Sequence, residues 1–277
     1  MRPICHCNEN ASQFCREISS LAPLLDSQDD VSCLGIKIDS FGHVVGHKVY
    51  RSARAFAGTD IGIACIDKQI RAGSIDVFEY ESDNALARLN LAEKLNLHFS
   101  SPSTYRHCFD RIRSAIDFVD LERFFELHSG LKARGDFECS SFGIERVDGQ
   151  VVKSTFYLFP VHAEGGRFRR SSVRFGDVAD KLSDLLPCRD VCEMCRDEGL
   201  RIVACTCARG QKPKWKLYFR LSDAVLGKFL PAEMTHRLYD SGCDFDVERI
   251  LVSLPMQEGA RHELTLYFAK RMLRRSE

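Results

Sequence analysis

The chain has 277 residues, of which 44% are hydrophobic, enough to build a core in one large domain. It carries 39 lysines and arginines against 39 aspartates and glutamates, so it lacks the overall positive charge of nucleic-acid binders, although a local basic pocket is allowed. It has no apolar signal region and no run long enough for a membrane span, and its 13 scattered cysteines indicate reduced thiols. We therefore expect a single domain over residues 1–277 that is cytoplasmic and has no nucleic-acid or membrane partner.

The first half of the chain is predicted to hold a short helix within residues 1–31 and two hairpins, followed by a mainly helical region over residues 84–131. The helical region is broken at Ser101-Pro102-Ser103. Residues 60–70 could be helical instead of part of the second hairpin. The predicted strand pairs are 33–39 with 47–50, and 61–66 with 75–80.

The second half is predicted to hold three more hairpins. Residues 163–176 are basic and contain glycine, which predicts a loop. Helical spacing predicts helices over about 178–198, with Gly199 as the stop, and over 225–238. The predicted strand pairs are 142–145 with 153–159, 202–206 with 214–221, and 250–254 with 262–268.

The strand predicted over residues 214–221 has the clearest division into two faces, because a strand sends alternate side chains to opposite sides. One face is cationic: Lys214, Lys216, Tyr218 and Arg220. The other face is apolar: Trp215, Leu217, Phe219 and Leu221. Taken alone, such a strand is more often a solvated edge whose lysines discourage aggregation. Three cations and a tyrosine in one row would also suit the inside of a barrel that holds a diphosphate.

This two-faced pattern recurs along the chain. When the second strand of each predicted hairpin is aligned on its tyrosine, five of the seven tyrosines take one position: Tyr50, Tyr80, Tyr157, Tyr218 and Tyr267. Their neighbours on the opposite face are mostly apolar. Hairpins separated by amphipathic helices, with the apolar face outward, predict an α+β fold in which ten antiparallel strands close into a β-barrel surrounded by helices. A barrel of ten strands is too wide for side chains alone to fill, so it should hold a ligand or water.

The repeat plan resembles that of the ABBA prenyltransferases, in which five αββα repeats close a ten-strand barrel (the PT barrel) around the active site. The resemblance lies in the order of hairpins and helices and in strands such as 142–145 with 153–159, and 264–267 with Ala269-Lys270-Arg271. Among the branches of the family, the chain looks most like the cyanobactin-type peptide prenyltransferases of natural product biosynthesis, particularly over residues 200–272.

The resemblance implies transfer of a prenyl group, as from dimethylallyl diphosphate, to a nucleophilic side chain of a peptide or to an aromatic small molecule. Cations would bind the diphosphate, tyrosine rings would shield the allylic cation, and a carboxylate would take the acceptor's proton. The residues expected to bind the prenyl diphosphate are Lys48, Tyr50, Tyr157, Lys214, Lys216, Tyr218, Arg220 and Tyr267, with Arg51 and Lys153 as additional candidates. Strand parity offers four carboxylates as the base, of which Glu145 is favoured over Asp39, Asp76 and Glu263. Mg²⁺ could assist; we expect no organic cofactor and no metal ligands from the protein.

Two other interpretations stay open: a barrel that binds a phosphorylated or lipid-like ligand without chemistry, and a metalloprotein. The second rests on Cys188, Cys192 and Cys195, whose spacing matches the cluster-binding cysteines of radical SAM enzymes. These cysteines interrupt an apolar helical pattern late in the chain, without a glycine-rich cofactor segment after them, which argues against a cluster. Asp26-x-x-Asp29-Asp30 looks like half of an aspartate-rich diphosphate motif, but it has no second copy. P-loop, Rossmann, His-Glu-x-x-His and Gly-x-Ser-x-Gly motifs are absent from the sequence.

Overall fold

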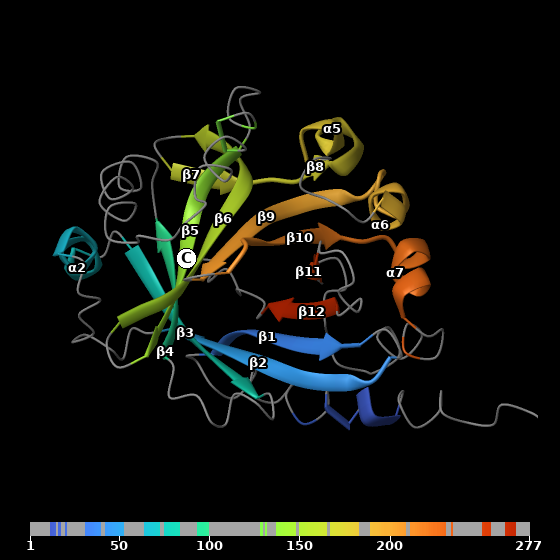
Figure 1. Ribbon diagram of the computed structural model, residues 1–277, viewed down its shortest axis with the longest axis horizontal. Helices are drawn as coiled ribbons and strands as arrows, with labels where there is room; N and C mark the ends of the chain where they lie inside the picture. The colour runs from blue at the N-terminus through green and yellow to red at the C-terminus, as the bar shows by residue number, and fades with distance from the viewer. Residues whose placement is uncertain are drawn as a thin grey trace, which may run out of the picture.

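The computed structural model describes residues 12–14, 16–17, 20, 31–39, 42–52, 64–72, 75–83, 93–99, 128–129, 131, 137–147, 150–164, 167–182, 189–208, 211–230, 234, 251–255 and 264–269. Twelve strands lie in these ranges, and all of their pairings are antiparallel (Figure 1). The strands are β1 (Val31–Ile38), β2 (Val44–Ser52), β3 (Ile75–Asp83), β4 (Glu93–Phe99), β5 (Phe137–Val147), β6 (Gln150–Glu164), β7 (Arg167–Arg170), β8 (Val173–Arg174), β9 (Gly199–Ala208), β10 (Lys214–Arg220), β11 (Leu251–Pro255) and β12 (Leu264–Ala269).

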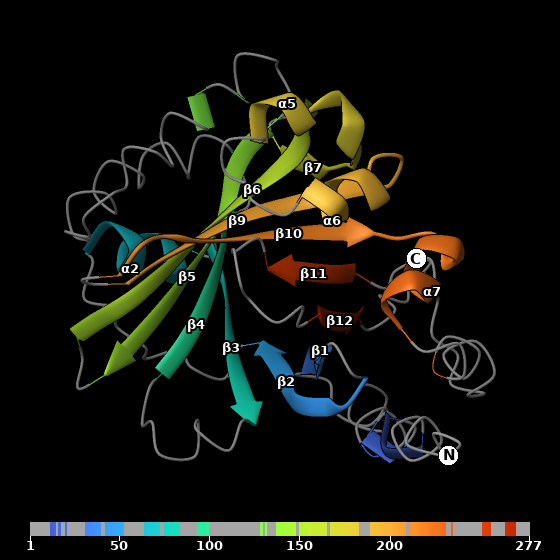
Figure 2. The same ribbon diagram turned by 45° about the vertical axis from the view of Figure 1, so that its right-hand side comes forward.

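The strands follow the order β7-β6-β5-β4-β3-β2-β1-β12-β11-β10-β9-β8. The first and the last of the described strands therefore pair, because β12 lies between β1 and β11, as both ribbon views show (Figures 1 and 2). The long strand β6 pairs with β5 on one edge. On its other edge it pairs with β7 over Val161–Glu164 and with β9 over Lys153–Leu158. The last pairing joins strands that lie far apart in the strand order.

The helices of the described residues lie outside the strands, and three of them gather beside β9 and β10 (Figures 1 and 2). None of them is long and apolar enough to cross a membrane. The predicted combination of antiparallel strands with covering helices is confirmed. The helices are α2 (Ala64–Arg71), α5 (Ala179–Leu182), α6 (Arg189–Met194) and α7 (Asp223–Phe229), with a 3₁₀ turn, η3 (Phe175–Asp177).

The apolar face of the strands packs against these helices to form the main core. On β10 this face carries three buried side chains, as predicted: Trp215, Leu217 and Phe219. The ring of Phe219 meets that of Phe175 in η3 edge-on, with 5.3 Å between centroids. The same core includes Leu226 of α7 and residues of α5 and α6. Burial of this face provides most of the driving force for placing the helices.

The opposite face carries a second, smaller cluster. Tyr218 and Tyr267 are buried there with Ala204, and four partly buried side chains pack against them: Cys33, Tyr50, Tyr157 and Ile202. We call this side of the strands the tyrosine face. The strands thus have a partly or fully buried surface on both sides, which the period of two in their sequences permits.

The second hairpin differs from the prediction. Residues 64–71 form the helix α2, because Ile66 and Ile70, four residues apart, fall on one helix face and join the main core. The partner of β3 is instead β4, within the region predicted to be helical. Tyr80 therefore lies in the first strand of its hairpin, opposite Tyr50 in β2, and not in the second strand.

Two other predicted segments are also corrected. Residues 163–176 are not a loop: β6 runs to Glu164, and β7, β8 and η3 follow. The helix predicted over 178–198 ends early, and Gly199 begins β9 instead of stopping a helix. The cause is a set of backbone bonds, in which the N–H groups of Phe175 and Gly176 donate to the carbonyls of Glu198 and Arg196 and draw residues 196–198 out of helical geometry.

The remaining elements agree with the prediction where the structure describes them. The hairpins β1–β2, β5–β6, β9–β10 and β11–β12 are present. The helix predicted over 225–238 begins as α7 at Asp223, and Met234 is helical. Residues 12–14, 16–17 and 20 are helical, in agreement with an N-terminal helix. The Asp26-x-x-Asp29-Asp30 motif lies outside the described residues.

Replacing Phe219 with alanine is expected to lower the free energy of unfolding by about 3–5 kcal/mol, because it removes a fully buried ring from the main core. The control is Val45→Ala, whose side chain is 42% exposed, and it should change the same quantity by less than about 0.5 kcal/mol. Urea denaturation of both variants measures the difference. Equal effects would show that the core against η3 does not hold β10.

Candidate functional site

Four of the tyrosines predicted to share a site come together on the tyrosine face. Ring centroids are 6.1 Å apart for Tyr50 and Tyr267, 5.8 Å for Tyr267 and Tyr218, and 6.4 Å for Tyr218 and Tyr157. These spacings are those of interacting aromatic pairs. The rings come from β2, β12, β10 and β6, and we call them the aromatic row. The side chain of Tyr80 is not among those that the structure describes.

Gly35 makes room for the aromatic row. It lies opposite Tyr267 in the register of β1 and β12, and a Cβ atom added to it would come within 3.2 Å of Tyr267 Cε1 and 3.3 Å of Cδ1. The ring of Tyr267 therefore lies over the backbone of Gly35. A lone glycine within a strand is a sequence signal of such a close approach.

Lysines from three other strands act on the charge of Lys216, which lies on the same face of β10 as Tyr218. Burial lowers the pKa of Lys216 from its usual 10.5 to about 8, and the positive charge of Lys48 is the second cause. Lys37 and Lys153 lower this pKa further, whereas Tyr267 raises it. The Nζ atom of Lys48 also lies 5.9 Å from the ring centroid of Tyr267. We call Lys37, Lys48, Lys153 and Lys216 the lysine cluster; Lys37 was not among the predicted site residues.

The charges of the lysine cluster would favour a bound anion. Burial and like charges both disfavour the charged form of Lys216, so an anion with several negative charges would relieve both penalties at once. A diphosphate has this charge and accepts charge-assisted hydrogen bonds from ammonium groups. The tyrosine rings beside the lysines offer π faces to a cation and an apolar wall to a hydrocarbon.

Glu145 lies on the tyrosine face, as strand parity predicted. It is opposite Lys153 in the register of β5 and β6, and its Oε2 accepts a hydrogen bond from Lys153 Nζ at 3.0 Å. The alternative Asp39 lies in the turn after β1. Its Oδ1 accepts a hydrogen bond from the backbone N–H of His43 at 2.9 Å, and its Oδ2 lies 3.0 Å from the imidazole Nδ1 of His43. The side chains of Asp76 and Glu263 are not among those that the structure describes.

The predicted cationic row of β10 differs in exposure along the strand. Lys214 is exposed, whereas Lys216 and Arg220 are half-buried. Lys216 and Arg220 are four residues apart, which is about 13 Å along the strand. Arg220 is near Arg201, the extra residue of a bulge in β9, and the pKa of Arg201 is lowered by burial and by the charge of Arg220.

Two hydrogen-bonded polar pairs on the strands were not predicted. Thr155 and Thr206 join β6 to β9 through their hydroxyl groups, 3.0 Å apart. His98 Nδ1 of β4 lies 2.7 Å from Ser141 Oγ of β5, and these residues are opposite each other in register. Thr155 and Thr206 come from different predicted hairpins, and His98 comes from the region predicted to be helical, so no local pattern in the sequence points to these pairs.

The cysteines give no sign of a metal site in the residues that the structure describes. Burial and the charge of Glu198 raise the pKa of Cys195 to about 12, which disfavours the thiolate that a metal requires. Among the described residues no group of three or more His, Cys, Asp or Glu could hold a metal ion. Cys188 lies outside them. Cys205 and Cys207 are buried in the main core with 3.7 Å between their sulfur atoms.

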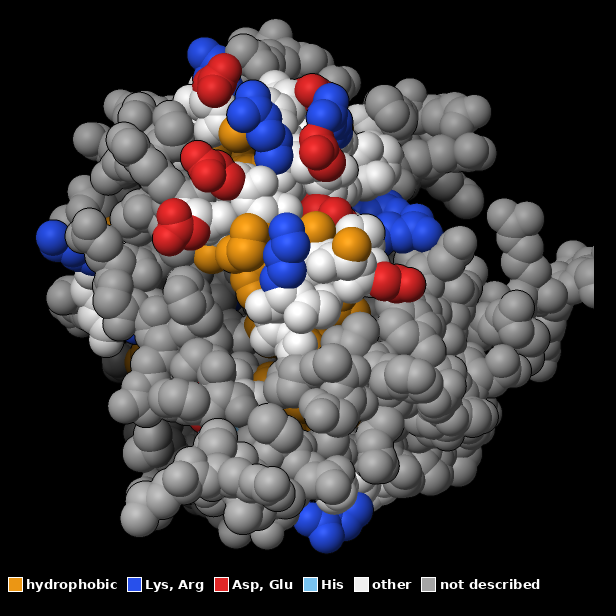
Figure 3. Space-filling view, turned by 90° about the vertical axis from the view of Figure 1, so that its right-hand side faces the viewer, with side chains coloured by type: hydrophobic (Ala, Val, Ile, Leu, Met, Phe, Trp, Pro, Cys, Tyr) orange, Lys and Arg blue, Asp and Glu red, His pale blue; other side chains and the backbone are white. Residues whose placement is uncertain are grey.

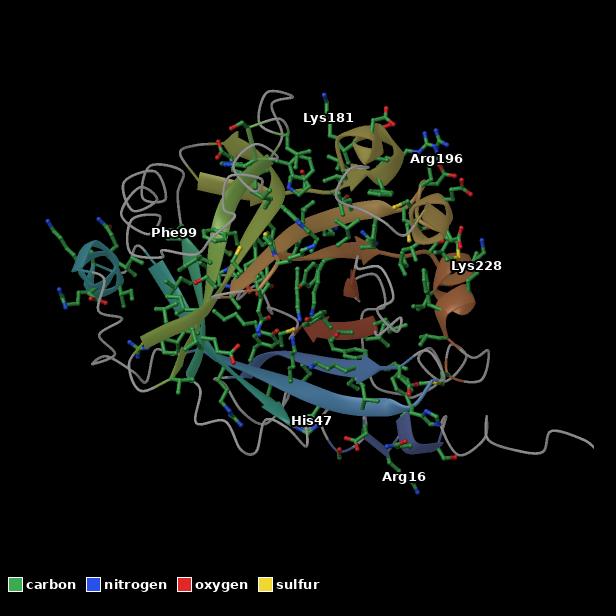
Figure 4. The ribbon with its side chains drawn as sticks, viewed as in Figure 1. Arg16, His47, Phe99, Lys181, Arg196 and Lys228 are labelled. Atoms are coloured by element: carbon green, nitrogen blue, oxygen red, sulfur yellow. The ribbon has the colours of Figure 1, made fainter. Side chains whose placement is uncertain are left out.

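The outer surface contrasts with the lysine cluster. Over α5, α6 and α7, side chains of both signs are interspersed (Figure 3). Lys181, Arg196 and Lys228 point away from the strands in the view with side chains (Figure 4). Arg174 and Asp197 form an exposed ion pair nearby. Such a surface is typical of a solvated face, so the concentration of one sign on the tyrosine face is a local feature.

Comparison with known proteins shows the fold. No family model matches the chain, and no curated protein matches its sequence. A 6-dimethylallyltryptophan synthase from Micromonospora olivasterospora, solved in complex with DMASPP and Trp, aligns with a TM-score of 0.50 and 12% identity over 88% of this chain and 83% of that chain. The chain has the ABBA-type fold of this enzyme.

Two further solved structures align with lower scores. AnaPT from Neosartorya fischeri has a TM-score of 0.48 and 13% identity over 86% of this chain and 78% of that chain. A structure described as 6-dimethylallyl tryptophan synthase has a TM-score of 0.47 and 13% identity over 89% and 82%. The cyanobactin-type peptide branch named in the sequence analysis stays a prediction.

Replacing Lys216 with methionine is expected to raise the free energy of unfolding at pH 7. The pKa of Lys216 is about 8 in the folded protein and 10.5 as its ordinary value, so below pH 8 the folded state carries an unfavourable charge. Between pH 8 and 10.5 the folded state of the wild type loses this charge first, so its stability rises and the gain from methionine shrinks. Urea denaturation at pH 7 and pH 10 measures both effects.

The matched control is Lys181→Met, at an exposed lysine of α5, which should change stability little at either pH. A Lys216→Met protein that is less stable than the wild type at pH 7 would show that the ammonium group stabilises the fold and is not held at a cost.

Proposed function

We propose that the chain is a prenyltransferase that moves a dimethylallyl group from dimethylallyl diphosphate to a nucleophile. The observation that carries the proposal is the half-buried Lys216, whose pKa the other members of the lysine cluster lower, on the same face of β10 as Tyr218 in the row of four tyrosine rings. A prenyl diphosphate has the two halves that match this arrangement: an anionic leaving group and a hydrocarbon that becomes a cation.

The lysine cluster would bind the diphosphate and stabilise it as it leaves. Lys216 and Lys48 are central, because each acts on the aromatic row and on the other. As the bond to the allylic carbon breaks, negative charge grows on the diphosphate, and fixed ammonium groups stabilise this charge more than that of the ground state. Mg²⁺ could add positive charge to the same diphosphate, and reaction in the presence of EDTA tests this.

The aromatic row would shield the allylic cation. Its rings present π faces, which attract a cation, and they exclude water, which would otherwise capture the cation as an alcohol. Tyr218 and Tyr267 are each only 8% exposed, which meets the requirement for a dry wall. Glu145, on the same face, is the proposed carboxylate that takes the acceptor's proton.

The strands would enclose this site as a closed barrel. The antiparallel pairing of β6 with β9 gives each of ten strands, β1–β6 and β9–β12, a neighbour on both edges. A closed ring of these ten strands would surround the tyrosine face and provide the ligand-sized interior expected of a wide barrel. We infer that the helices then cover the outer face, as in the predicted PT barrel.

The acceptor is proposed to be the nucleophilic side chain of a peptide, following the resemblance in residues 200–272. A free aromatic amino acid is the second candidate, and the observation that favours it is the shared fold with an enzyme solved in complex with DMASPP and Trp. We propose that either substrate is met in the cytoplasm.

Incubation with dimethylallyl diphosphate and either tryptophan or a panel of peptides tests the activity. We expect one acceptor class to gain the mass of a single dimethylallyl group, with release of diphosphate. Binding of the diphosphate without transfer to any acceptor would favour the non-catalytic barrel. If the protein neither binds dimethylallyl diphosphate nor releases diphosphate from it, the proposal is refuted.

Replacing Lys216 or Lys48 with alanine is expected to weaken binding of a non-hydrolysable thio-diphosphate analogue by about 10- to 100-fold, the range for a lost hydrogen bond to a charged group. Arg220→Ala should weaken it less, because Arg220 lies about 13 Å along β10 from Lys216. Isothermal titration calorimetry measures the affinities, with Lys181→Ala as the control. An equal loss in all four variants would mean that only overall charge matters.

The affinity of the wild type for the same analogue is expected to fall as the pH rises through about 8, because binding then requires Lys216 to take up a proton. Below this pH Lys216 is already charged, and affinity should be nearly constant. Titrations between pH 7 and 9.5 give the profile, and Lys216→Met should lack this step. A step of the same size in that variant would assign it to another lysine.

A further inference from the structure

We propose that Gly35 is a positioning residue for prenyl transfer, because its bare backbone lets the ammonium group of Lys48 and the ring of Tyr267 meet across β1. The contact would hold a ring that shields the allylic cation beside a group that binds the diphosphate. The inference rests on the proposed function and adds to it a residue that has no side chain of its own.

Gly35 lies between Lys48 and Tyr267 in the strand register. It is opposite Lys48 on the β2 edge of β1 and opposite Tyr267 on the β12 edge. Residues directly opposite each other in antiparallel strands share a face, so all three lie on the tyrosine face. The backbones of Lys48 and Tyr267 are two strand spacings apart, which is about 10 Å.

The two side chains close this distance over Gly35. The Nζ atom of Lys48 lies 5.9 Å from the ring centroid of Tyr267, within the range of a cation–π contact. A Cβ atom on Gly35 would come within 3.2 Å of Cε1 and 3.3 Å of Cδ1 of that ring, and within 3.4 Å of Thr265 Cγ2. Any side chain at position 35 would therefore compete with the ring of Tyr267 for the same space.

Space, and not backbone conformation, calls for glycine at position 35. Among the glycines that the structure describes, Gly42 has a positive φ, of 83°, and Gly35 does not. The backbone of β1 could thus accept an ordinary residue at position 35 without strain, and a glycine inside a strand weakens that strand. What the glycine provides instead is the close approach of Tyr267.

The ring of Tyr267 lies between two other rings of the aromatic row. Its centroid is 6.1 Å from that of Tyr50 and 5.8 Å from that of Tyr218, and Tyr267 is only 8% exposed. A displacement of this ring would therefore change its spacing to both neighbours and to Lys48. The charge of Lys48 in turn lowers the pKa of Lys216. A single glycine thus sets the relation between the lysine cluster and the aromatic row.

This relation matters when the allylic cation forms. The bond between C1 of the dimethylallyl group and the diphosphate oxygen breaks, and its electron pair leaves with the diphosphate. In transfer, an electron pair of the acceptor forms the new bond to carbon, and the acceptor's proton passes to the carboxylate of Glu145. In hydrolysis, water forms that bond instead, loses a proton to the solvent and gives dimethylallyl alcohol. A ring displaced from beside the leaving group shields the cation less, which favours hydrolysis.

The test measures the ratio of dimethylallyl alcohol to prenylated acceptor, using dimethylallyl diphosphate and a saturating amount of the acceptor that the wild type uses. Gly35→Ala is expected to raise this ratio by about 10-fold, because a small misplacement of a group at the reacting atoms is costly. The matched control is Gly227→Ala in α7, where an added Cβ atom meets nothing within 4 Å, and the ratio should stay within about 2-fold of the wild type. A loss of stability alone would lower the amount of active enzyme but would not change the ratio.

A double-mutant cycle shows whether Gly35 acts through Tyr267. Tyr267→Leu should itself raise the ratio, since it removes the ring. In this background Gly35→Ala should add less than about 2-fold, because no ring is left to displace. If Gly35→Ala alone does not fold, recovery of folding in the double variant, followed by urea denaturation, supports a clash with the ring. Failure of the double variant to fold counts against the inference.

The outcomes separate this inference from the proposed function. An unchanged ratio in Gly35→Ala, or an equal rise with and without the ring of Tyr267, overturns the inference alone, because transfer by the wild type still supports the proposed function. A wild type that transfers no prenyl group to any acceptor overturns the proposed function and the inference together.

Discussion

Burial of both faces of the same strands is the constraint on which this molecule depends. One face must be apolar to hold the helices, and β10 meets this with Trp215, Leu217 and Phe219 in the main core. The other face is then free to carry groups that a core would not tolerate. Alternation with a period of two lets a single strand satisfy both demands, since the two sets of side chains never compete for one environment. The stability needed to hold lysines together thus comes from the other side of the sheet.

The lysine cluster has the properties of a prepared binding site. Its members stand on four strands, and strands hold their side chains more rigidly than loops do. The positive charges are assembled before any anion arrives, at an expense of stability that shows in the lowered pKa of Lys216. Sites that bind charged ligands commonly carry such a cost in stability, because the like-charged groups that bind the ligand repel one another when the ligand is absent.

Two hydrogen-bonded polar pairs lie on the tyrosine face. Glu145 and Lys153 form an ion pair, and Lys153 belongs to the lysine cluster. His98 and Ser141 join β4 to β5, and Ser141 lies opposite Tyr157 in the register of β5 and β6. Each pair joins neighbouring strands, so the polar contacts of this face depend on the register between strands.

Local patterns in the sequence determined which side chains share a face of one strand. Alternation, which relates residues two apart, accounts for the two faces of β10 and for the place of Glu145. It also accounts for the shared face of the four tyrosines of the aromatic row. The short apolar run at 61–66 and the leucine-containing segment 93–99 were misassigned, because a few apolar residues fit a helix or a strand equally well until packing decides. Only the tertiary structure brought Lys37 into the lysine cluster, Gly35 under Tyr267 and His98 against Ser141. These contacts depend on the register between strands, which is a property of pairs of segments far apart in the chain.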